Sequence, residues 1–329
     1  MNTVALKELL KQYEQNKIRA EIALENKLQD FYNSNKKLLK INENINSTAI
    51  NISKAILLNK SSEEINNLKN TLEKLKKEKN EYLSNLNLPV TFFKPDYSCK
   101  VCNDIGYLDN NSMCNCLKQK LIDLEYNKSN IFNIKKENFD FFNLNLYSDE
   151  INQEKYNSNI SPRENIKNIK NIIDNFILNF DNPNEKNLLF TGNTGLGKTF
   201  LSSCIANEIL KKGKTVLYQT APAMLDSIID YKFNKTKDSF IYDNILNADL
   251  LIIDDLGTES LNNFKFSELF NIINTRILNQ NNHVTKTIIS TNLNLNNLFK
   301  NYDERIVSRF VGYYNICRFF GEDIRFKKM

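Results

Sequence analysis

The chain has 329 residues and a net charge of +5, from 44 lysines and arginines against 39 acidic residues. So mild a balance does not by itself indicate nucleic-acid binding, and the single histidine, His283, excludes Ser-His-Asp and Cys-His catalysis and sites with two histidine ligands. There is no apolar run of about 18 residues and no signal peptide, so we expect a soluble, cytoplasmic protein without membrane contact.

The N-terminal part has a helical pattern. Residues 1–88 contain no glycine or proline, and apolar residues recur at helical spacing. From Ile65 to Leu86 they alternate steps of three and four, after a plausible N-cap at Ser61. We predict an all-α domain ending at residue 90, a helical hairpin or small bundle broken around Asn42 to Ser62. The sequence leaves open whether it is a packed or oligomer-forming unit or a docking module for a partner helix.

Four cysteines cluster in the next predicted segment, residues 91–136. Cys99 and Cys102 form a C-x-x-C pair, and Cys114 and Cys116 form a C-x-C pair. Four thiolates at this spacing are typical of a closed tetrahedral metal site, which has no open position for catalysis. We predict structural zinc bracing the joint between the helical domain and the rest of the chain; an iron–sulfur cluster or no metal are the alternatives.

A phosphate-binding loop follows at residues 192–199, between a predicted strand and a predicted helix. Glycine is needed where a backbone wraps phosphates closely, and the loop amides and the helix N-terminus favour anions. Lys198 is expected to reach the β- and γ-phosphates of ATP, and Thr199 to bind Mg²⁺. The predicted nucleotide contacts are Gly192, Asn193, Thr194, Gly195, Leu196, Gly197, Lys198, Thr199 and Phe200.

From about residue 166 the pattern alternates short apolar strands with helices, which predicts a parallel sheet wrapped by helices. The predicted ATPase domain covers residues 166–329, after a linker and nucleotide-edge segment at 137–165. The expected strands are Asn187–Thr191, Thr215–Gln219, Leu250–Asp254, Thr287–Thr291 and a fifth within Tyr314–Phe320.

Polar residues at two strand ends are candidates for catalysis. Asp254 and Asp255 end a buried strand; Asp254 is placed to coordinate Mg²⁺ and Asp255 to orient or deprotonate the attacking water. Asn292 ends the next strand and is placed to hold that water, although an asparagine-rich turn is the alternative. Arg305 and Arg309 share a helix face and are candidates to stabilise phosphoryl charge, or form an ordinary solvated pair.

Taken together, Gly192–Thr199, Leu250–Glu259, Thr287–Asn292 and Glu304–Phe310 resemble the AAA+ ATPases of the DnaC/DnaI helicase-loader and IstB group. The resemblance implies an α/β fold of the P-loop AAA+ type, with a five-stranded parallel sheet and no helical lid. It implies ATP hydrolysis, self-assembly when ATP is bound, and an arginine finger at Arg309, or at Arg305 as second choice.

The resemblance further implies a loader that delivers a replicative hexameric helicase to single-stranded DNA. The alternatives are an IstB-type transposition accessory ATPase and an ATP-gated docking scaffold with little turnover. In loaders and initiators, the region after the second strand touches single-stranded DNA. The matching candidates here are Tyr231, Lys232, Phe233, Lys235 and Lys237, against the alternative of a solvated surface helix.

Overall fold

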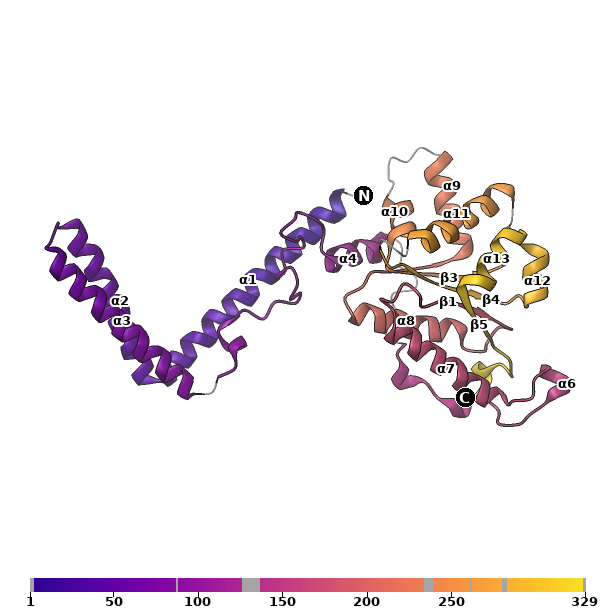
Figure 1. Ribbon diagram of the computed structural model, residues 1–329, viewed down its shortest axis with the longest axis horizontal. Coiled ribbons are helices and arrows are strands. Elements are labelled where there is room, and N and C mark those ends of the chain that lie inside the picture. The colour runs from indigo at the N-terminus through magenta and orange to yellow at the C-terminus, as the bar shows by residue number, and fades with distance from the viewer. Residues whose placement is uncertain are drawn as a thin grey trace. The chain divides into compact units, whose positions relative to one another are not determined.

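The computed structural model describes residues 3–86, 88–125, 137–233, 240–260, 262–279 and 283–327 (Figure 1). The chain divides into two compact units, Leu10–Leu108 and Met1–Leu9 with Asp109–Met329. Each unit is described by itself below. Within the described ranges, no helix combines the length and the apolar character needed to cross a membrane.

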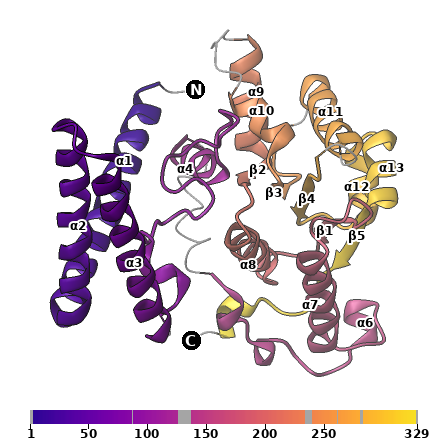
Figure 2. The same cartoon turned by 60° about the vertical axis from the view of Figure 1, so that its left-hand side comes forward.

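The helical unit contains a long antiparallel helix pair. Its elements are α1 (Thr3–Ser34) from Leu10 onward, α2 (Lys36–Leu57), α3 (Ser62–Asn85) and the 3₁₀ turn η1 (Val90–Phe93). Figures 1 and 2 show α2 and α3 side by side. The predicted N-cap is confirmed, because the Ser61 hydroxyl accepts a hydrogen bond from the Glu64 backbone N–H at 3.3 Å.

The predicted break around Asn42 to Ser62 is wrong over most of its length. Helix α2 continues without interruption to Leu57, and the chain turns only at residues 58–61. Asparagine and serine are weak helix formers, but packing against α3 outweighs that preference. A pattern in the sequence does predict this helix, because the positions that are buried or half-buried recur at steps of three and four. They are Leu38, Ile41, Ile45, Thr48, Ile52 and Ala55.

The second unit is built on a five-stranded parallel sheet, as predicted. Its strands lie in the order β2-β3-β4-β1-β5, and all pairings are parallel. Their bounds are β1 (Asn187–Thr191), β2 (Val216–Thr220), β3 (Leu250–Leu256), β4 (Lys286–Thr291) and β5 (Tyr314–Arg318). Strand β3 extends past Asp254 because its pairing with β4 shifts register between Ile253 and Leu256.

Helices cover both faces of the sheet, because residues of both faces are buried. Leu188, Phe190 and Ile252 belong to the cluster that packs with α7 and α8, whereas Leu189 and Ile253 face α9, α10, α11 and α13 (Figure 1). The flanking helices are α4 (Asn115–Glu125), α6 (Gln153–Tyr156), α7 (Pro162–Leu178), α8 (Lys198–Lys211), α9 (Ala221–Phe233), α10 (Phe240–Asn247), α11 (Asn263–Asn279), α12 (Leu295–Asn301) and α13 (Glu304–Tyr313).

Helix α4 protects the edge of the sheet at β2. The Gln119 carboxamide donates to Val216 O at 3.0 Å and accepts from Val216 N at 2.7 Å. These are the two hydrogen bonds that a neighbouring strand would make. An exposed strand edge can pair with a strand of another chain, and the Gln119 side chain prevents such pairing at Val216.

Three short 3₁₀ turns complete the unit and lie near the phosphate loop. They are η2 (Phe139–Phe141), η3 (Leu144–Leu146) and η4 (Ile324–Lys327). Asn138 and Asn143 cap the first two by accepting hydrogen bonds from the N–H groups of Asp140 and Asn145. The three turns bring two segments that are distant in sequence to one cavity.

Candidate nucleotide-binding site

The loop between β1 and α8 has the conformation that a phosphate cradle needs. Gly192 has φ +136°, and a Cβ there would lie 2.2 Å from Phe319 O. Gly195 has φ +74°, and a Cβ there would meet the Asp323 carboxylate at 2.1 Å. Larger residues are therefore excluded at both positions by conformation and by space. Helix α8 begins at Lys198, which directs its first backbone N–H groups toward the loop.

Lys198 lies at the centre of the loop. Its ammonium donates to Gly192 O at 2.6 Å, to Asn193 O at 2.7 Å and to Asn292 Oδ1 at 2.9 Å. The structure thus brings together the loop lysine and the asparagine at the end of β4. Burial lowers the pKa of Lys198 to about 8, although the Asp255 and Asp254 carboxylates act in the opposite direction.

The two carboxylates at the end of β3 have different surroundings. Asp254 is only 4% exposed, and it accepts hydrogen bonds from Tyr218 OH at 2.7 Å and from Ser290 Oγ. Asp255 lies on the register shift with φ +56°, a left-handed conformation that aspartate tolerates better than most residues. Burial raises the pKa of Asp255, and the Asp254 charge raises it further.

A cavity of about 410 Å³ opens over the loop, within the size range of small-molecule sites. Residues Thr194 to Phe200 line one side, with Asp255 and Asn292. A second wall is mainly aromatic and apolar. It contains Phe141, Phe142, Leu146, Tyr147 and Ile324, together with the polar residues Glu137, Asn143 and Arg325. A polar phosphate end and an apolar end suit a nucleotide with its base against the aromatic wall.

The sequence did not indicate the residues that hold this second wall to the loop. Tyr147 OH donates to Leu196 O at 3.0 Å, and Ile324 N donates to Gly195 O at 2.9 Å. Arg325 lines the cavity and forms an ion pair with Asp323. Residues 137–165 were predicted only as a linker and nucleotide-edge segment, because 3₁₀ turns have no periodic pattern that would identify the individual residues of the wall.

Glu259, four residues after Asp255, is a further carboxylate near the end of β3, but both of its oxygens have partners outside the cavity. Its Oε2 accepts from Gly257 N at 2.8 Å, and its other oxygen accepts from Tyr302 OH. Both oxygens therefore stabilise the turn after β3. Asp255 lines the cavity and is therefore better placed than Glu259 to activate a water molecule.

The two arginines of α13 do not line this cavity. The Arg305 guanidinium makes two hydrogen bonds of 3.0 Å to the Asp303 carboxylate. Arg309 donates from Nε to Asn274 Oδ1 at 3.0 Å and lies 5.7 Å from the centre of the Phe270 ring. Of the two guanidinium groups, Arg309 therefore has fewer hydrogen bonds to the described chain.

The predicted DNA-contact residues are placed only in part. Lys232 forms a 2.6 Å ion pair with Glu268, and Tyr231 stacks on Tyr242 with ring centres 5.9 Å apart. Phe233 is exposed. Lys235 and Lys237 lie outside the described residues.

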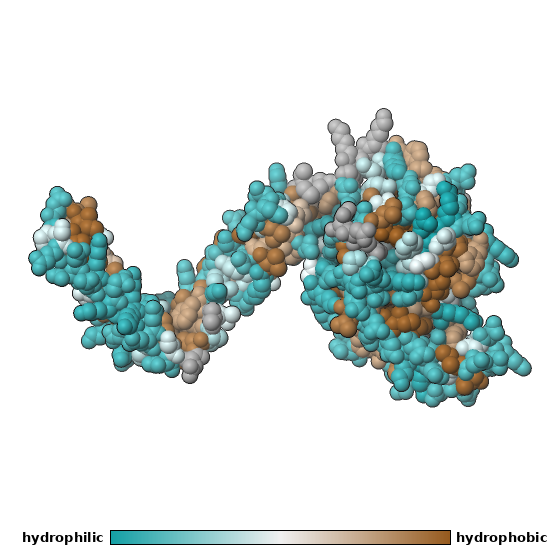
Figure 3. All heavy atoms as spheres, in the orientation of Figure 1, coloured by the Kyte–Doolittle hydropathy of each residue, from teal (hydrophilic) through white to brown (hydrophobic). Residues whose placement is uncertain are grey.

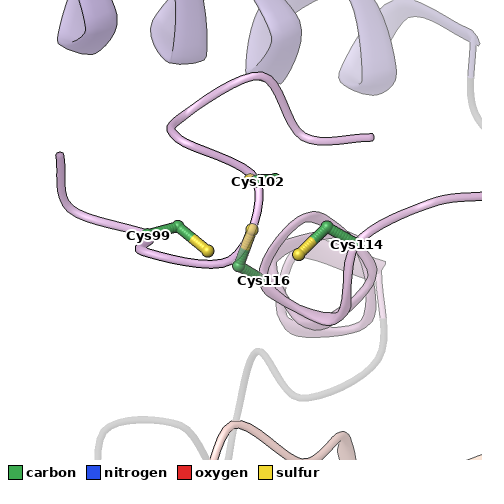
Figure 4. Close-up of side chains that lie close together, drawn as sticks. All are labelled: Cys99, Cys102, Cys114 and Cys116. Atoms are coloured by element: carbon green, nitrogen blue, oxygen red, sulfur yellow. The ribbon is translucent and has the colours of Figure 1, made fainter. Parts of the chain in front are cut away.

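The four clustered cysteines come together as their spacing predicted. Their sulfur atoms all lie within 4.8 Å of one another (Figure 4). Cys99 and Cys102 lie in the preceding loop, Cys114 immediately precedes α4, and Cys116 lies in its first turn. A tetrahedron with Zn–S bonds of about 2.3 Å has sulfur–sulfur edges of about 3.8 Å, so the donor set fits one zinc ion better than a cluster of several metals. The Gly106 N–H also donates to Cys102 Sγ at 3.3 Å, as expected for a thiolate ligand.

Residues 151–311 match the family described as IstB-like ATP binding protein. These residues form an IstB-like ATP-binding domain. Part of the chain is similar to the replicative helicase loader DnaC of Escherichia coli K12, at 29% identity over 135 residues, covering 41% of this chain and 53% of DnaC. The chain thus spans about half the length of the curated DnaC relatives it matches.

The ATP-binding domain has further similar proteins. The chromosomal replication initiator DnaA of Helicobacter hepaticus is 35% identical over 127 residues, covering 37% of this chain and 26% of DnaA. Among solved structures, the DnaC helicase loader aligns with a TM-score of 0.44 at 23% identity, covering 57% of this chain and 98% of that one. DnaI aligns with a TM-score of 0.41 at 23% identity, covering 56% and 95%. Independently of these alignments, the five-stranded parallel sheet with helices on both faces is the α/β fold class that the sequence predicted.

Proposed function

We propose that this protein is an ATPase that loads a replicative hexameric helicase onto single-stranded DNA. The observation that carries the proposal is the contact of Lys198 with Asn292 beside Asp255, in a domain similar to the replicative helicase loader DnaC. A loop lysine joined to residues at two strand ends is suited to report whether a terminal phosphate is present.

ATP binding exchanges the partners of Lys198. In the structure the ammonium is satisfied by two loop carbonyls and by the Asn292 carboxamide. Phosphate oxygens are charged and therefore stronger acceptors than these neutral groups. When Lys198 turns to the phosphates, the Asn292 carboxamide is released to orient a water molecule.

Two residues would hold magnesium, Thr199 on the cavity wall and Asp254 at the end of β3. A bound Mg²⁺ neutralises charge on the phosphoryl oxygens. Asp255 faces the same cavity and takes a proton from the attacking water. Its raised pKa makes it a stronger base than an ordinary carboxylate.

Hydrolysis is completed by a neighbouring subunit. Arg309 lies on α13, outside the cavity of its own subunit, and has one hydrogen bond within the described chain, to Asn274. We assign it as the arginine finger that reaches the ATP of the next protomer. Arg305 is the weaker choice, because Asp303 engages it with two hydrogen bonds.

The helical unit provides a surface for the helicase. The tip of the α2–α3 hairpin exposes Ile56, Leu57 and Leu58, and Leu57 is 81% exposed. Figure 3 shows this apolar tip among polar neighbours. Exposed apolar side chains gathered in one place are typical of a protein-binding surface.

Single-stranded DNA would contact α9. The ring of Phe233 contacts Phe264 with ring centres 4.9 Å apart but is 64% exposed, so it could still stack on a base, with Tyr231 as a second aromatic. Lys232 would have to leave Glu268 to reach a phosphate. We therefore expect Lys235 and Lys237, rather than Lys232, to make most of the contacts with the DNA phosphates.

The test is co-purification of the full chain with the replicative helicase of its host, with and without ATP. We expect capture that depends on ATP and is lost in Lys198→Ala. Capture of a transposase instead would favour an IstB-type role. ATP-dependent capture together with slow hydrolysis that Arg309→Ala leaves unchanged would favour an ATP-gated docking scaffold. Capture that is unchanged in Lys198→Ala would overturn the loader proposal.

A further inference from the structure

Asp254 is held by two side chains, of which Tyr218 belongs to none of the sequence motifs. Tyr218 OH donates to Asp254 Oδ2 at 2.7 Å, and Ser290 Oγ donates to Oδ1. The Asp255 N–H also donates to Oδ1, at 3.1 Å. A carboxylate has about four acceptor positions, so these donors fill three and leave one, on the oxygen that faces Tyr218.

The register of the sheet explains why Tyr218 reaches Asp254. In the β2–β3 pairing, Tyr218 lies opposite Ile252, and Thr220 lies opposite Asp254. Side chains alternate between the two faces of a strand, so Tyr218 and Asp254 share a face and are diagonal neighbours. A long aromatic side chain spans that diagonal, whereas a shorter residue would not.

The phenol of Tyr218 donates its proton to Asp254 in this position. Tyr218 is 2% exposed, so water does not compete for this hydrogen bond. The buried Ser203 side chain, one turn after Thr199 on α8, lies within reach of the same hydroxyl. The phenol thus connects the helix that carries one candidate magnesium ligand to the strand that carries the other.

We propose that Tyr218 is a positioning residue for magnesium binding, which fixes the Asp254 carboxylate so that its last free acceptor position serves the ion or its water. This inference rests on the nucleotide-binding part of the proposed function. Without the hydroxyl, Oδ2 would have two open positions and the carboxylate would lose a restraint on its rotation. ATP itself touches Lys198 and the loop, so nucleotide affinity without metal does not depend on Tyr218.

A purely structural role makes a different prediction. A buried tyrosine that only fills the core would change stability and would affect nucleotide binding equally with and without magnesium. The matched control is Tyr314→Phe, because Tyr314 is equally buried but belongs to the core cluster on the other face of the sheet. Both variants delete one hydroxyl and keep the ring, so neither creates a large cavity.

The experiment titrates full-length protein with a fluorescent non-hydrolysable ATP analogue, in EDTA and over a range of Mg²⁺ concentrations. For Tyr218→Phe we expect unchanged affinity in EDTA and about a 10-fold higher Mg²⁺ concentration at half effect, the size expected for one hydrogen bond to a charged group. Tyr314→Phe should behave as the unmodified protein. Ser203→Ala should give a smaller shift of the same sign, and no further shift when added to Tyr218→Phe.

Two results would overturn the inference. One is an unchanged Mg²⁺ dependence in Tyr218→Phe, and the other is an equal loss of affinity in EDTA and in magnesium. Both are read against unmodified protein that binds the analogue in a magnesium-dependent way. If the unmodified protein does not bind the analogue at all, the proposed function itself fails.

Discussion

Replacing Asp255 by asparagine separates the roles of the two carboxylates at the end of β3. Asp255 has φ +56°, and asparagine is among the few residues that adopt this conformation readily. Its backbone N–H donates to Asp254 Oδ1 at 3.1 Å and to Ser290 Oγ at 3.2 Å, and neither bond needs the side chain. The substitution therefore keeps the geometry and removes only the base.

The expected effect on hydrolysis follows from that loss. A positioned general base contributes about 10²- to 10⁴-fold, so Asp255→Asn should lower the hydrolysis rate by that factor. ATP affinity should be equal or higher, because a negative charge has been removed from the cavity.

The same substitution should raise stability at neutral pH. Burial and the Asp254 charge raise the pKa of Asp255 above its ordinary 3.8, so the ionised side chain opposes folding. This cost is present above the folded pKa and disappears below pH 3.8, where the carboxyl is protonated in both states. Asp255→Asn should accordingly unfold at a higher temperature at pH 7, and the gain should vanish in acid.

The assay combines phosphate release, analogue binding and thermal unfolding on the same preparations. Glu259→Gln is the matched control, because its carboxylate stabilises a turn and does not line the cavity. It should lose about 1 kcal/mol of stability and keep hydrolysis. The reasoning is refuted if Asp255→Asn hydrolyses ATP within about threefold of the unmodified rate, or if Glu259→Gln shows the larger loss.

Three further predictions concern the charged and metal-binding groups. Burial lowers the pKa of Lys198 to about 8, and a bound triphosphate favours its protonated form. ATP binding in EDTA at about pH 8.5 should therefore take up most of a proton, which calorimetry in two buffers measures. Binding without proton uptake would contradict the lowered pKa. Arg309→Ala should keep analogue affinity within about twofold and lower hydrolysis about 10³-fold, and an equal loss in Arg305→Ala would contradict the assignment. Cys114→Ser should lower the zinc content from about one per chain to near zero by elemental analysis, and unchanged zinc would argue against the four-cysteine site.

The sequence predicted the strands well, because each is a short apolar run between polar turns. The bounds of β1 are those expected, and β4 and β2 differ by one residue or so. Helix α2 was missed because its asparagines and serines suggested a break, while the heptad spacing that holds it against α3 was overlooked.

The site was predictable only where one motif contains it. The phosphate loop and the Asp254–Asp255 pair are contiguous in sequence, so their chemistry is visible there. Tyr218 contacts Asp254 because of the register in which β2 and β3 pair, and this register cannot be deduced from a single sequence. The aromatic wall at 139–147 was likewise hidden, because irregular turns have no period.

The most direct test of the account is a titration of purified full-length protein with a non-hydrolysable ATP analogue in magnesium, beside Lys198→Ala. We expect saturable binding at micromolar concentrations and a loss of affinity of at least about 100-fold in Lys198→Ala, because the ammonium contacts charged phosphate oxygens. Absence of binding at about 1 mM analogue, or equal binding by Lys198→Ala, would contradict it.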